Sequence, residues 1–376
     1  MIKVINVISD TNIGGAGKYL LTYLKHADRS RFDLSVVLPK DSLLKPRIEA
    51  LDVRVFEVDA MSDRSLDRRA IGALKKIFLA ERPDIVHSHA SMSARIAARR
   101  SGVGAIAYTR HSVFPPSPRI SKGLGKKLNG MINNHYCDGI IAVAEAAKQN
   151  LVDTGVDPKK ISVILNGVEP MRSLSAQEAS AARERFGVRD GQRVVSIIAR
   201  LNPVKGHEYF IRAARKVRDS GVDTKFIIAG TGETEGRLRQ LADELGLGDA
   251  VVFAGFLDDV APLLGITDIQ VNASYGTEAT SLSLLEGMSL GIPAVVSDFG
   301  GNPGVITDGQ NGLITPQRDA DALADALVRL LGDSGQIAQM QSRAKQIFTE
   351  KFTAQIMSAN IERFYANLVN KGGQTK

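Results

Sequence analysis

The chain has 376 residues, of which 44% are hydrophobic and 24% are charged. Typical domains hold roughly 100–200 residues, so this length suggests two of them. The composition is that of a globular protein and excludes global disorder. The single cysteine, Cys137, excludes an intramolecular disulfide and a four-cysteine zinc site.

The net charge of +7 is unevenly distributed. Residues 1–170 contain 26 Lys/Arg and 17 Asp/Glu (+9), whereas the remainder contains 22 and 24 (−2). Between Asp84 and Asp138 there are eight basic residues and no acidic one. Neither interleaved aromatic residues nor a recognised motif supports nucleic-acid binding. There is no run of 18 apolar residues and no signal-peptide pattern, so we expect a cytoplasmic protein.

Apolar strands alternate with amphipathic helices along most of the chain, which is typical of parallel α/β sheets. Helices are predicted at 19–26, 71–80, 91–100 and 146–154, and apolar residues at helical spacing also occupy 210–217. The first set of predicted strands is 2–7, 33–38, 53–56, 85–87, 105–108, 140–143 and 161–164. After a polar stretch at 170–192, a second set follows at 194–199, 225–229, 251–254, 269–273 and 294–297.

These two sets predict two doubly wound Rossmann-like domains, residues 1–170 and 171–353. An apolar stripe on the last segment, 354–376, predicts a final helix that packs back on the first domain. In such sheets, ligands bind beyond the carboxyl ends of the strands. We therefore expect a site between the two domains, and motifs at strand ends carry the functional hypotheses.

A glycine-rich turn, Gly14-Gly15-Ala16-Gly17-Lys18, follows the first strand. Such a turn lets backbone N–H groups approach a phosphate at the start of a helix. A P-loop is excluded because Tyr19 follows Lys18, and Leu20 breaks the dinucleotide fingerprint. A plain tight turn is the alternative.

Two cations, Arg200 and Lys205, lie in the turn after the first strand of the second domain. Arginine offers a planar fork to phosphate oxygens and lysine a point charge, so the pair predicts a diphosphate site. Solvated surface charges are the alternative. For the turn Gly230-Thr231-Gly232, a structural role is favoured.

Glu278 and Glu286 flank the start of a predicted helix that begins near Thr280 and Ser281. Glu278 is expected in the loop beside the reacting group. Glu286 is expected on the helix, where it would accept hydrogen bonds from a sugar diol. The alternative is a helix-start glutamate together with an exposed one.

Histidines cluster near strand ends of the first domain at His87, His89 and His111. His87 and His89 share one strand face. A metal site would need a third ligand from elsewhere, so we expect hydrogen bonding to substrate hydroxyls or a structural role. Asp319-Ala320-Asp321 is interpreted as a helix cap and not as a metal ligand.

Together these residues resemble the retaining glycosyltransferases of family 4 (glycosyl transferases group 1), which have the GT-B fold of two Rossmann-like domains. The resemblance covers essentially the whole chain. Besides the turns and glutamates above, it includes segments 83–87, 166–169, 252–256 and 300–303. Two departures stand out: Ala279-Thr280 replaces the usual Gly-Phe, and Gly304 replaces a glutamate. These departures bear on the donor sugar.

The resemblance implies a nucleotide-diphosphate-sugar donor in the second domain and no metal or other cofactor. Arg200 and Lys205 would bind the diphosphate, Glu286 the ribose, and Glu278 the region of the transferred sugar and the phosphates. Gly14 and Gly15 would approach the diphosphate from the first domain, and His111 would lie near the sugar. The remaining predicted donor contacts are Thr280, Ser281 and Leu282 toward the phosphates, and the region 253–257, with Phe253 as the named contact, near the base.

The sequence therefore predicts sugar transfer with retention to a glycan, lipid-linked or other hydroxyl acceptor, in cell-surface polysaccharide or glycolipid synthesis. Alternatives are a GT-B epimerase or phosphorylase, and a catalytically silent sugar-nucleotide-binding partner of another transferase. The basic residues Arg119, Lys122, Lys126 and Lys127 predict peripheral contact with an anionic membrane at its inner face. A solvated basic face is the alternative.

Overall fold

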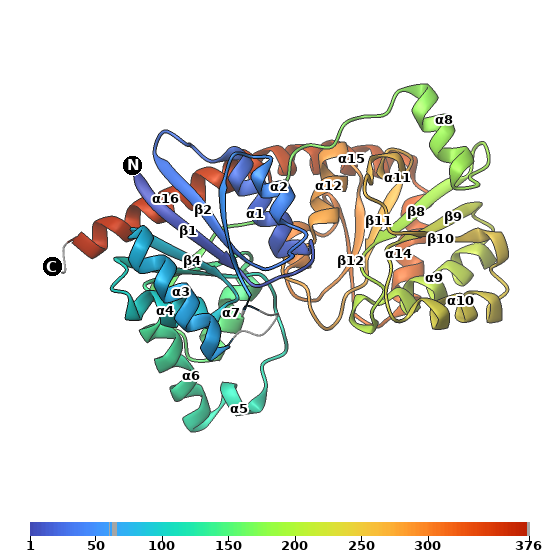
Figure 1. Ribbon diagram of the computed structural model, residues 1–376. Helices are drawn as coiled ribbons and strands as arrows, with labels where there is room; N and C mark the ends of the chain where they lie inside the picture. Colours follow the sequence, from blue (N-terminus) through green and yellow to red (C-terminus); the bar gives the residue numbers. More distant parts are fainter. Residues whose placement is uncertain (60, 62–65, 374–376) are drawn as a thin grey trace. The chain divides into compact units, whose positions relative to one another are not determined.

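The computed structural model describes residues 1–59, 61 and 66–373 (Figure 1). The chain divides into two compact units, Met1–Gly167 with Thr353–Lys376, and Val168–Phe352. Residues 374–376, the end of the predicted final segment, lie outside the described residues. Each unit is built on one parallel sheet with helices on both faces, which confirms the predicted pair of doubly wound domains.

The first unit contains a seven-stranded sheet in the order β3-β2-β1-β4-β5-β6-β7. Its strands are β1 (Ile2–Ile8), β2 (Phe32–Pro39), β3 (Arg54–Val58), β4 (Ile85–His89), β5 (Ala105–Arg110), β6 (Gly139–Ala142) and β7 (Ile161–Val163). Its helices are α1 (Gly15–His26), α2 (Lys45–Glu49), α3 (Arg68–Glu81), α4 (Met92–Arg100), α5 (Pro118–Ser121), α6 (Gly123–His135), α7 (Glu145–Asp153) and α16 (Ala354–Gly373).

Apolar side chains explain why these helices cover the first sheet. Leu74 and Phe78 of α3 pack with residues of α4 and with the strands in one core cluster. The final helix, α16, also belongs to this unit: the Glu362 carboxylate accepts a hydrogen bond of 2.7 Å from the Asp28 N–H. Tyr365 is fully buried beside the Tyr23 ring, with centroids 6.0 Å apart. The predicted docking of the last helix on the first domain is therefore confirmed.

The second unit contains a six-stranded parallel sheet in the order β10-β9-β8-β11-β12-β13. Its strands are β8 (Arg193–Ile198), β9 (Thr224–Ala229), β10 (Val251–Gly255), β11 (Ile269–Asn272), β12 (Ala294–Ser297) and β13 (Gly312–Thr315). Its helices are α8 (Ala176–Arg185), α9 (His207–Asp219), α10 (Glu235–Glu244), α11 (Ala261–Leu264), α12 (Leu282–Leu290), α13 (Asn302–Val305), α14 (Ala320–Leu331) and α15 (Ser334–Lys351).

The second sheet is also buried on both faces. One cluster joins its strands to α9 and α14 through residues such as Phe210 and Leu327. Another joins the opposite side to α8 and α11 through Phe186 and Leu263. Strand β13 was not predicted from the sequence. In both sheets the crossovers bring the loops after the central strands to one edge, which is where side chains can meet a ligand.

Candidate functional site

At the carboxyl edge of the second sheet, two of the predicted donor-binding residues, Lys205 and Glu278, form an ion pair. The Lys205 ammonium lies 2.8 Å from Glu278 Oε2 and also donates a hydrogen bond of 3.1 Å to the Thr277 carbonyl. The same Glu278 oxygen accepts hydrogen bonds of 3.2 Å from Asn272 Nδ2 and from the Ser274 hydroxyl. Glu278 is 8% exposed. Three donors thus hold a buried carboxylate, and that carboxylate fixes the position of the lysine.

Two glycines allow the loops around this pair to come together. Gly206 has φ +73°, and a Cβ there would collide with the Ala273 carbonyl. Gly300 has φ +61°, and a Cβ there would collide with the carbonyl of Glu278. The Gly301 N–H donates to that same Glu278 carbonyl at 3.2 Å. At both places, therefore, glycine is required by the close approach of backbone segments.

A chain of hydrogen bonds links the loop that carries Glu278 to Asn302, at the start of α13. Asn302 Nδ2 donates to the Ser297 hydroxyl at 3.1 Å, and that hydroxyl donates to the Ser274 carbonyl at 2.5 Å. Ser274 in turn donates to Glu278. The segment predicted from Gly300 to Pro303 thus supports the loop that carries Glu278. At Gly304, where the family usually has a glutamate, a Cβ would meet no atom within 4 Å, so packing does not require glycine there.

Arg200 lies in the same turn as Lys205, and its side chain is exposed. Within the described part of the chain, its guanidinium has no hydrogen bond or ion pair, so it can meet an incoming anion. The turn rests on the glycines that follow β9. A Cβ on Gly230 would collide with the Ala199 carbonyl, and one on Gly232 with the Leu201 carbonyl. This supports the structural role favoured for these two glycines.

Helix α12 begins beside the Lys205–Glu278 pair. Ser281 is its N-cap residue, and the Ser281 hydroxyl accepts a bond of 3.4 Å from the Leu284 N–H. Thr280, Ser281 and Leu282 are all half-buried at this helix start. Their position places the helix N-terminus, with its partial positive charge, at the strand edge. Glu286 is half-buried in the second turn of the same helix.

Phe253 is not part of this group of loops. It lies within β10, where its ring packs against the main core cluster and under the Arg239 guanidinium, 4.4 Å from the ring centroid. The aromatic residue at the end of the strand is Phe256, which is 70% exposed. Phe256 belongs to the region 253–257 that the resemblance places near the base, although only Phe253 was named as a contact. Its place three residues after Phe253, directly past the strand, was the available signal.

The carboxyl edge of the first sheet is different in character. Gly14 caps α1, and Gly15 begins the helix without an acidic residue in the first turn. A Cβ on Gly15 would meet no atom within 4 Å. Packing within the unit therefore does not require glycine at position 15. The lack of a side chain there leaves the N–H groups at the start of the helix open to a ligand. Gly17, by contrast, is buried, and a Cβ there would press on the Leu44 side chain.

Three histidines lie next to one another at this edge. The rings of His87 and His89 are 4.4 Å apart, and those of His89 and His111 are stacked at 5.2 Å. His87 bridges the Tyr365 hydroxyl at 2.6 Å and the Thr109 hydroxyl at 2.7 Å. His87 is therefore a structural histidine, joined to the last helix. Sequence reasoning missed Tyr365 because it lies 278 residues further along the chain.

His89 connects His111 to the buried residue Asn6. His89 Nδ1 lies 2.9 Å from His111 Nε2, and His89 Nε2 lies 3.3 Å from Asn6 Oδ1. The amide oxygen only accepts, so His89 carries its proton on Nε2 and accepts at Nδ1 from His111 Nε2–H. In this pattern His111 Nδ1 is an acceptor, able to receive a hydrogen bond from a hydroxyl.

Burial keeps these imidazoles neutral. Desolvation lowers the pKa of His87 and of His111 to about 3. The pKa of His89 is lowered well below its usual range by burial, then by the neighbouring His87 and His111. At neutral pH this edge therefore offers three uncharged imidazoles that can form hydrogen bonds.

The described residues contain no group of three or more His, Cys, Asp or Glu side chains able to hold a metal ion. Asp319 caps α14, since its side chain accepts from the N–H groups of Asp321 and Ala322, as the sequence predicted. Among the described helices, none is long and apolar enough to cross a bilayer.

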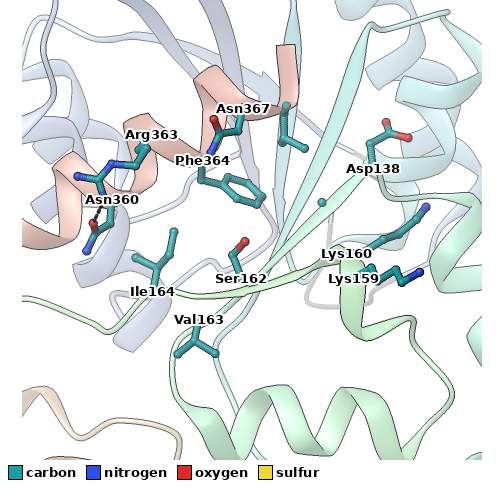
Figure 2. Close-up of a pocket in the computed structure, with 12 residues that line it drawn as sticks. Asp138, Lys159, Lys160, Ser162, Val163, Ile164, Asn360, Arg363, Phe364 and Asn367 are labelled. Atoms are coloured by element: carbon teal, nitrogen blue, oxygen red, sulfur yellow. Dashed lines mark hydrogen bonds between the residues drawn. The ribbon is translucent and has the colours of Figure 1, made fainter. Parts of the chain in front are cut away.

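A separate hollow of about 280 Å³ lies beside edge strand β7 and α16 (Figure 2). It opens at the amino end of β6, near Asp138 and Gly139, away from the strand ends that carry the motifs. Lys160 there donates to the carbonyls of Asn134 and Cys137, and Arg363 to Asn360. The hollow is therefore not the predicted site.

Comparison with known proteins accounts for both units. Residues 178–347 match the family model of glycosyl transferases group 1, and residues 13–172 match that of glycosyltransferase family 4. The UDP-Gal:alpha-D-GlcNAc-diphosphoundecaprenol alpha-1,3-galactosyltransferase of Escherichia coli is 28% identical over 346 residues, which is 88% of each chain. The putative glycosyltransferase EpsD of Bacillus subtilis is 30% identical over 273 residues, covering 68% of this chain and 70% of EpsD.

Solved structures share the same architecture. Anabaena HepE, determined in complex with UDP-glucose, superposes with a TM-score of 0.84 at 22% identity, covering 98% of this chain and 100% of HepE. A glycosyltransferase from Rickettsia africae also gives a TM-score of 0.84, at 18% identity and 98% coverage of both chains. At this identity the superpositions establish the fold.

Proposed function

This chain belongs to the group 1 glycosyltransferases of family 4, with the GT-B fold, and from that premise we propose that it transfers a sugar from a nucleotide-diphosphate sugar with retention at the anomeric carbon. The observation that carries the proposal is the cluster of Arg200, Lys205 and Glu278 beside the N-terminus of α12. The names of the E. coli relative and of the HepE complex make UDP the first nucleotide to test.

In the proposed reaction, the bond between the anomeric carbon and the β-phosphate oxygen breaks, and a bond to the acceptor oxygen forms on the same face. The acceptor proton moves to the departing diphosphate, which leaves as the nucleoside diphosphate. The transition state resembles an oxocarbenium ion, and negative charge accumulates on the leaving group. Arg200, Lys205 and the start of α12 stabilise that charge. The reaction needs no metal or other cofactor.

We assign the remaining residues by their positions. Glu278 holds Lys205 and lies beside the transferred sugar, Glu286 accepts from the ribose hydroxyls, and Thr280, Ser281 and Leu282 face the phosphates. We add Phe256, which is 70% exposed directly past β10, to the half-buried Phe253 as an aromatic residue beside the base. On the first unit, Gly14 and Gly15 approach the diphosphate, and His111 Nδ1 accepts from a sugar hydroxyl.

The acceptor is proposed to be a glycan or a lipid-linked glycan in cell-surface polysaccharide or glycolipid synthesis. The E. coli relative is named for a diphosphoundecaprenol-linked acceptor, which supports the lipid-linked form. The enzyme would then work in the cytoplasm, peripherally at the inner face of the membrane. The exposed basic residues Arg119, Lys122 and Lys127 supply charge for that contact, whereas Lys126 is half-buried on the side of its helix that faces Gly155.

The test begins with a thermal-shift screen against UDP, GDP, ADP and their sugars, since a ligand of the native state raises its melting temperature. The selected donor is then assayed with wild type, Lys205→Ala and Glu286→Ala, with Lys351→Ala and Glu244→Ala as matched surface controls. The proposal is supported if Lys205→Ala and Glu286→Ala lose transfer while the two controls keep it, and if the product has the retained anomeric configuration. Normal turnover in both Lys205→Ala and Glu286→Ala, an epimerised nucleotide sugar or a requirement for free phosphate would contradict it.

A further inference from the structure

Helix α6 presents its apolar side chains outward. Leu124, Leu128 and Met131 are spaced four and three residues apart, so they lie on one face of the helix. They are 84%, 54% and 63% exposed. Ile120 of the adjoining α5 is exposed as well. The two helices lie next to each other at the periphery of the first unit (Figure 1). An exposed apolar stripe of this kind marks an interaction surface.

The opposite face of α6 explains this orientation. Gly130 is the buried residue of the helix, and a Cβ there would collide with the Gly155 carbonyl. Asn129 Nδ2 donates 2.6 Å to the Thr154 carbonyl, and Asn133 Oδ1 accepts from Arg95 at 3.0 Å. The helix is thus anchored to the protein by glycine contact and hydrogen bonds. This arrangement reverses the usual amphipathic helix, which buries its apolar face.

The outward face is bordered by positive charge. Arg119, Lys122 and Lys127 are exposed, and Lys127 shares a surface hollow of about 420 Å³ with Leu124, Leu128 and Met131. No acidic residue occurs between Asp84 and Asp138, so neither helix contributes a negative charge. We call the set of Ile120, Leu124, Leu128, Met131, Arg119, Lys122 and Lys127 the α5–α6 surface.

We propose that the α5–α6 surface inserts its apolar side chains into an anionic phospholipid bilayer, with the cations at the level of the headgroups. Helices lie in membrane interfaces by this combination of apolar burial and electrostatic attraction. A second copy of the chain is a poorer occupant, because it would bring two sets of like charges together over a few side chains, and stable interfaces bury about 800 Å² per partner. The proposal deepens the proposed function by fixing where the enzyme meets a lipid-linked acceptor.

The experiment is vesicle flotation of the full chain, which requires no sugar transfer. Phosphatidylcholine vesicles are compared with vesicles that also contain phosphatidylglycerol. The apolar variant is Leu124→Ser/Leu128→Ser/Met131→Ser, and the charge variant is Arg119→Gln/Lys122→Gln/Lys127→Gln. All six side chains are exposed, so their replacement does not disturb the core. Leu79→Ser, at a 52% exposed residue of α3, and Lys76→Gln/Lys351→Gln are the matched controls.

We expect wild type and both controls to float with the anionic vesicles, and partition of each α5–α6 variant to fall at least about tenfold. Unchanged melting temperatures exclude unfolding as the cause. The proposal is overturned if wild type does not bind, if it binds neutral vesicles equally well, or if the apolar variant binds like wild type. It is also overturned if wild type sediments as a dimer that the apolar variant dissociates.

The same variants separate this proposal from the proposed function. With a water-soluble acceptor analogue, their transfer rates are expected to equal that of wild type, since none lies at the donor site. If wild type transfers sugar normally but does not bind vesicles, only the membrane proposal is overturned. Vesicle binding without any nucleotide-sugar turnover would overturn the proposed function alone.

Discussion

The carboxyl edges of the two sheets are built from different chemistry. The second sheet presents a cation, Lys205, held by a buried carboxylate, with a further exposed cation at Arg200. The first sheet presents an open glycine turn and three histidines that burial keeps neutral. In the proposed function, the cations of the second edge stabilise the departing diphosphate, and the neutral His111 of the first edge accepts a hydrogen bond from a sugar hydroxyl. Similar topology thus supports separate roles, because the side chains after corresponding strands differ.

The largest expected effect comes from removing the fixed cation of the second edge. Lys205→Met should lower kcat/KM for the nucleotide sugar by about 10²–10³-fold, the range found when one preorganised transition-state donor is lost. Lys205→Arg should restore part of the rate because it keeps the charge. Steady-state kinetics with the selected donor measure this, and Lys351→Met is the control. A Lys205→Met enzyme with wild-type kinetics would show that the leaving group is stabilised elsewhere.

Acid should destabilise the fold at the carboxyl edge of the first sheet, where the buried histidines lie. His87 has a pKa near 3 in the folded protein because it is buried, whereas unfolded histidine titrates near 6.5, so the unfolded state binds the proton first. The unfolding free energy should therefore fall as the pH drops below about 6.5, by roughly 2 kcal/mol at pH 5 for such a histidine.

Thermal unfolding between pH 7.5 and 5 tests this expectation, with His87→Gln as the variant. Its melting temperature should depend less on pH than that of wild type, while His135→Gln, at an exposed position, should keep the wild-type slope. Equal slopes for wild type and His87→Gln would mean that folding does not lower the pKa of His87.

A substitution of Glu286 tests whether this residue binds the ribose of the donor. Glu286→Gln keeps the shape of the side chain and weakens a charge-assisted hydrogen bond to a hydroxyl, so affinity should fall by about tenfold. The loss should appear with UDP and disappear with a 2′,3′-dideoxy analogue, which lacks the ribose diol. If the variant binds both nucleotides as wild type does, Glu286 does not contact the ribose.

Glycines on the two edges are expected to respond in opposite ways. Gly300→Ala should destabilise the second unit, because φ is +61° and the Glu278 carbonyl occupies the space of a Cβ. Gly15→Ala meets no atom, and alanine favours helix, so stability should be unchanged or higher by about 0.5–1 kcal/mol. Donor turnover by Gly15→Ala should nevertheless fall. A stable Gly15→Ala enzyme with full activity would remove Gly15 from the donor site.

Much of the fold could be predicted from the sequence because both sheets are buried on both faces. Every predicted strand is present, since continuous apolar runs mark such strands. One further strand, β13 (Gly312–Thr315), was not predicted, because only its two central residues, Leu313 and Ile314, are apolar. Helix α6 shows another limit: its apolar spacing is that of a core-facing helix, but the packing of Gly130 on Gly155 and the hydrogen bonds of Asn129 and Asn133 turn that face outward.

The candidate site was predictable where it follows a strand and unpredictable where it depends on distant contacts. Motifs after β8 and β11 located Lys205 and Glu278, but not the ion pair between them. Phe253 stays a predicted contact of the base: its ring is half-buried against the core cluster, and the more exposed ring of Phe256 follows the strand. The links from His87 to Tyr365 and from His89 to Asn6 join segments far apart in the sequence and exist only after folding.

We infer that the charged edge of the second sheet binds the diphosphate of the donor. Isothermal titration of wild type and Arg200→Ala with UDP tests it most directly, or with GDP or ADP if the screen selects that base, and the free nucleoside serves as the control. Arg200 is exposed, so its removal should leave the fold intact. We expect the Kd for the diphosphate to rise at least about tenfold, while binding of the nucleoside is unchanged. Equal diphosphate affinity in the two proteins would contradict the claim.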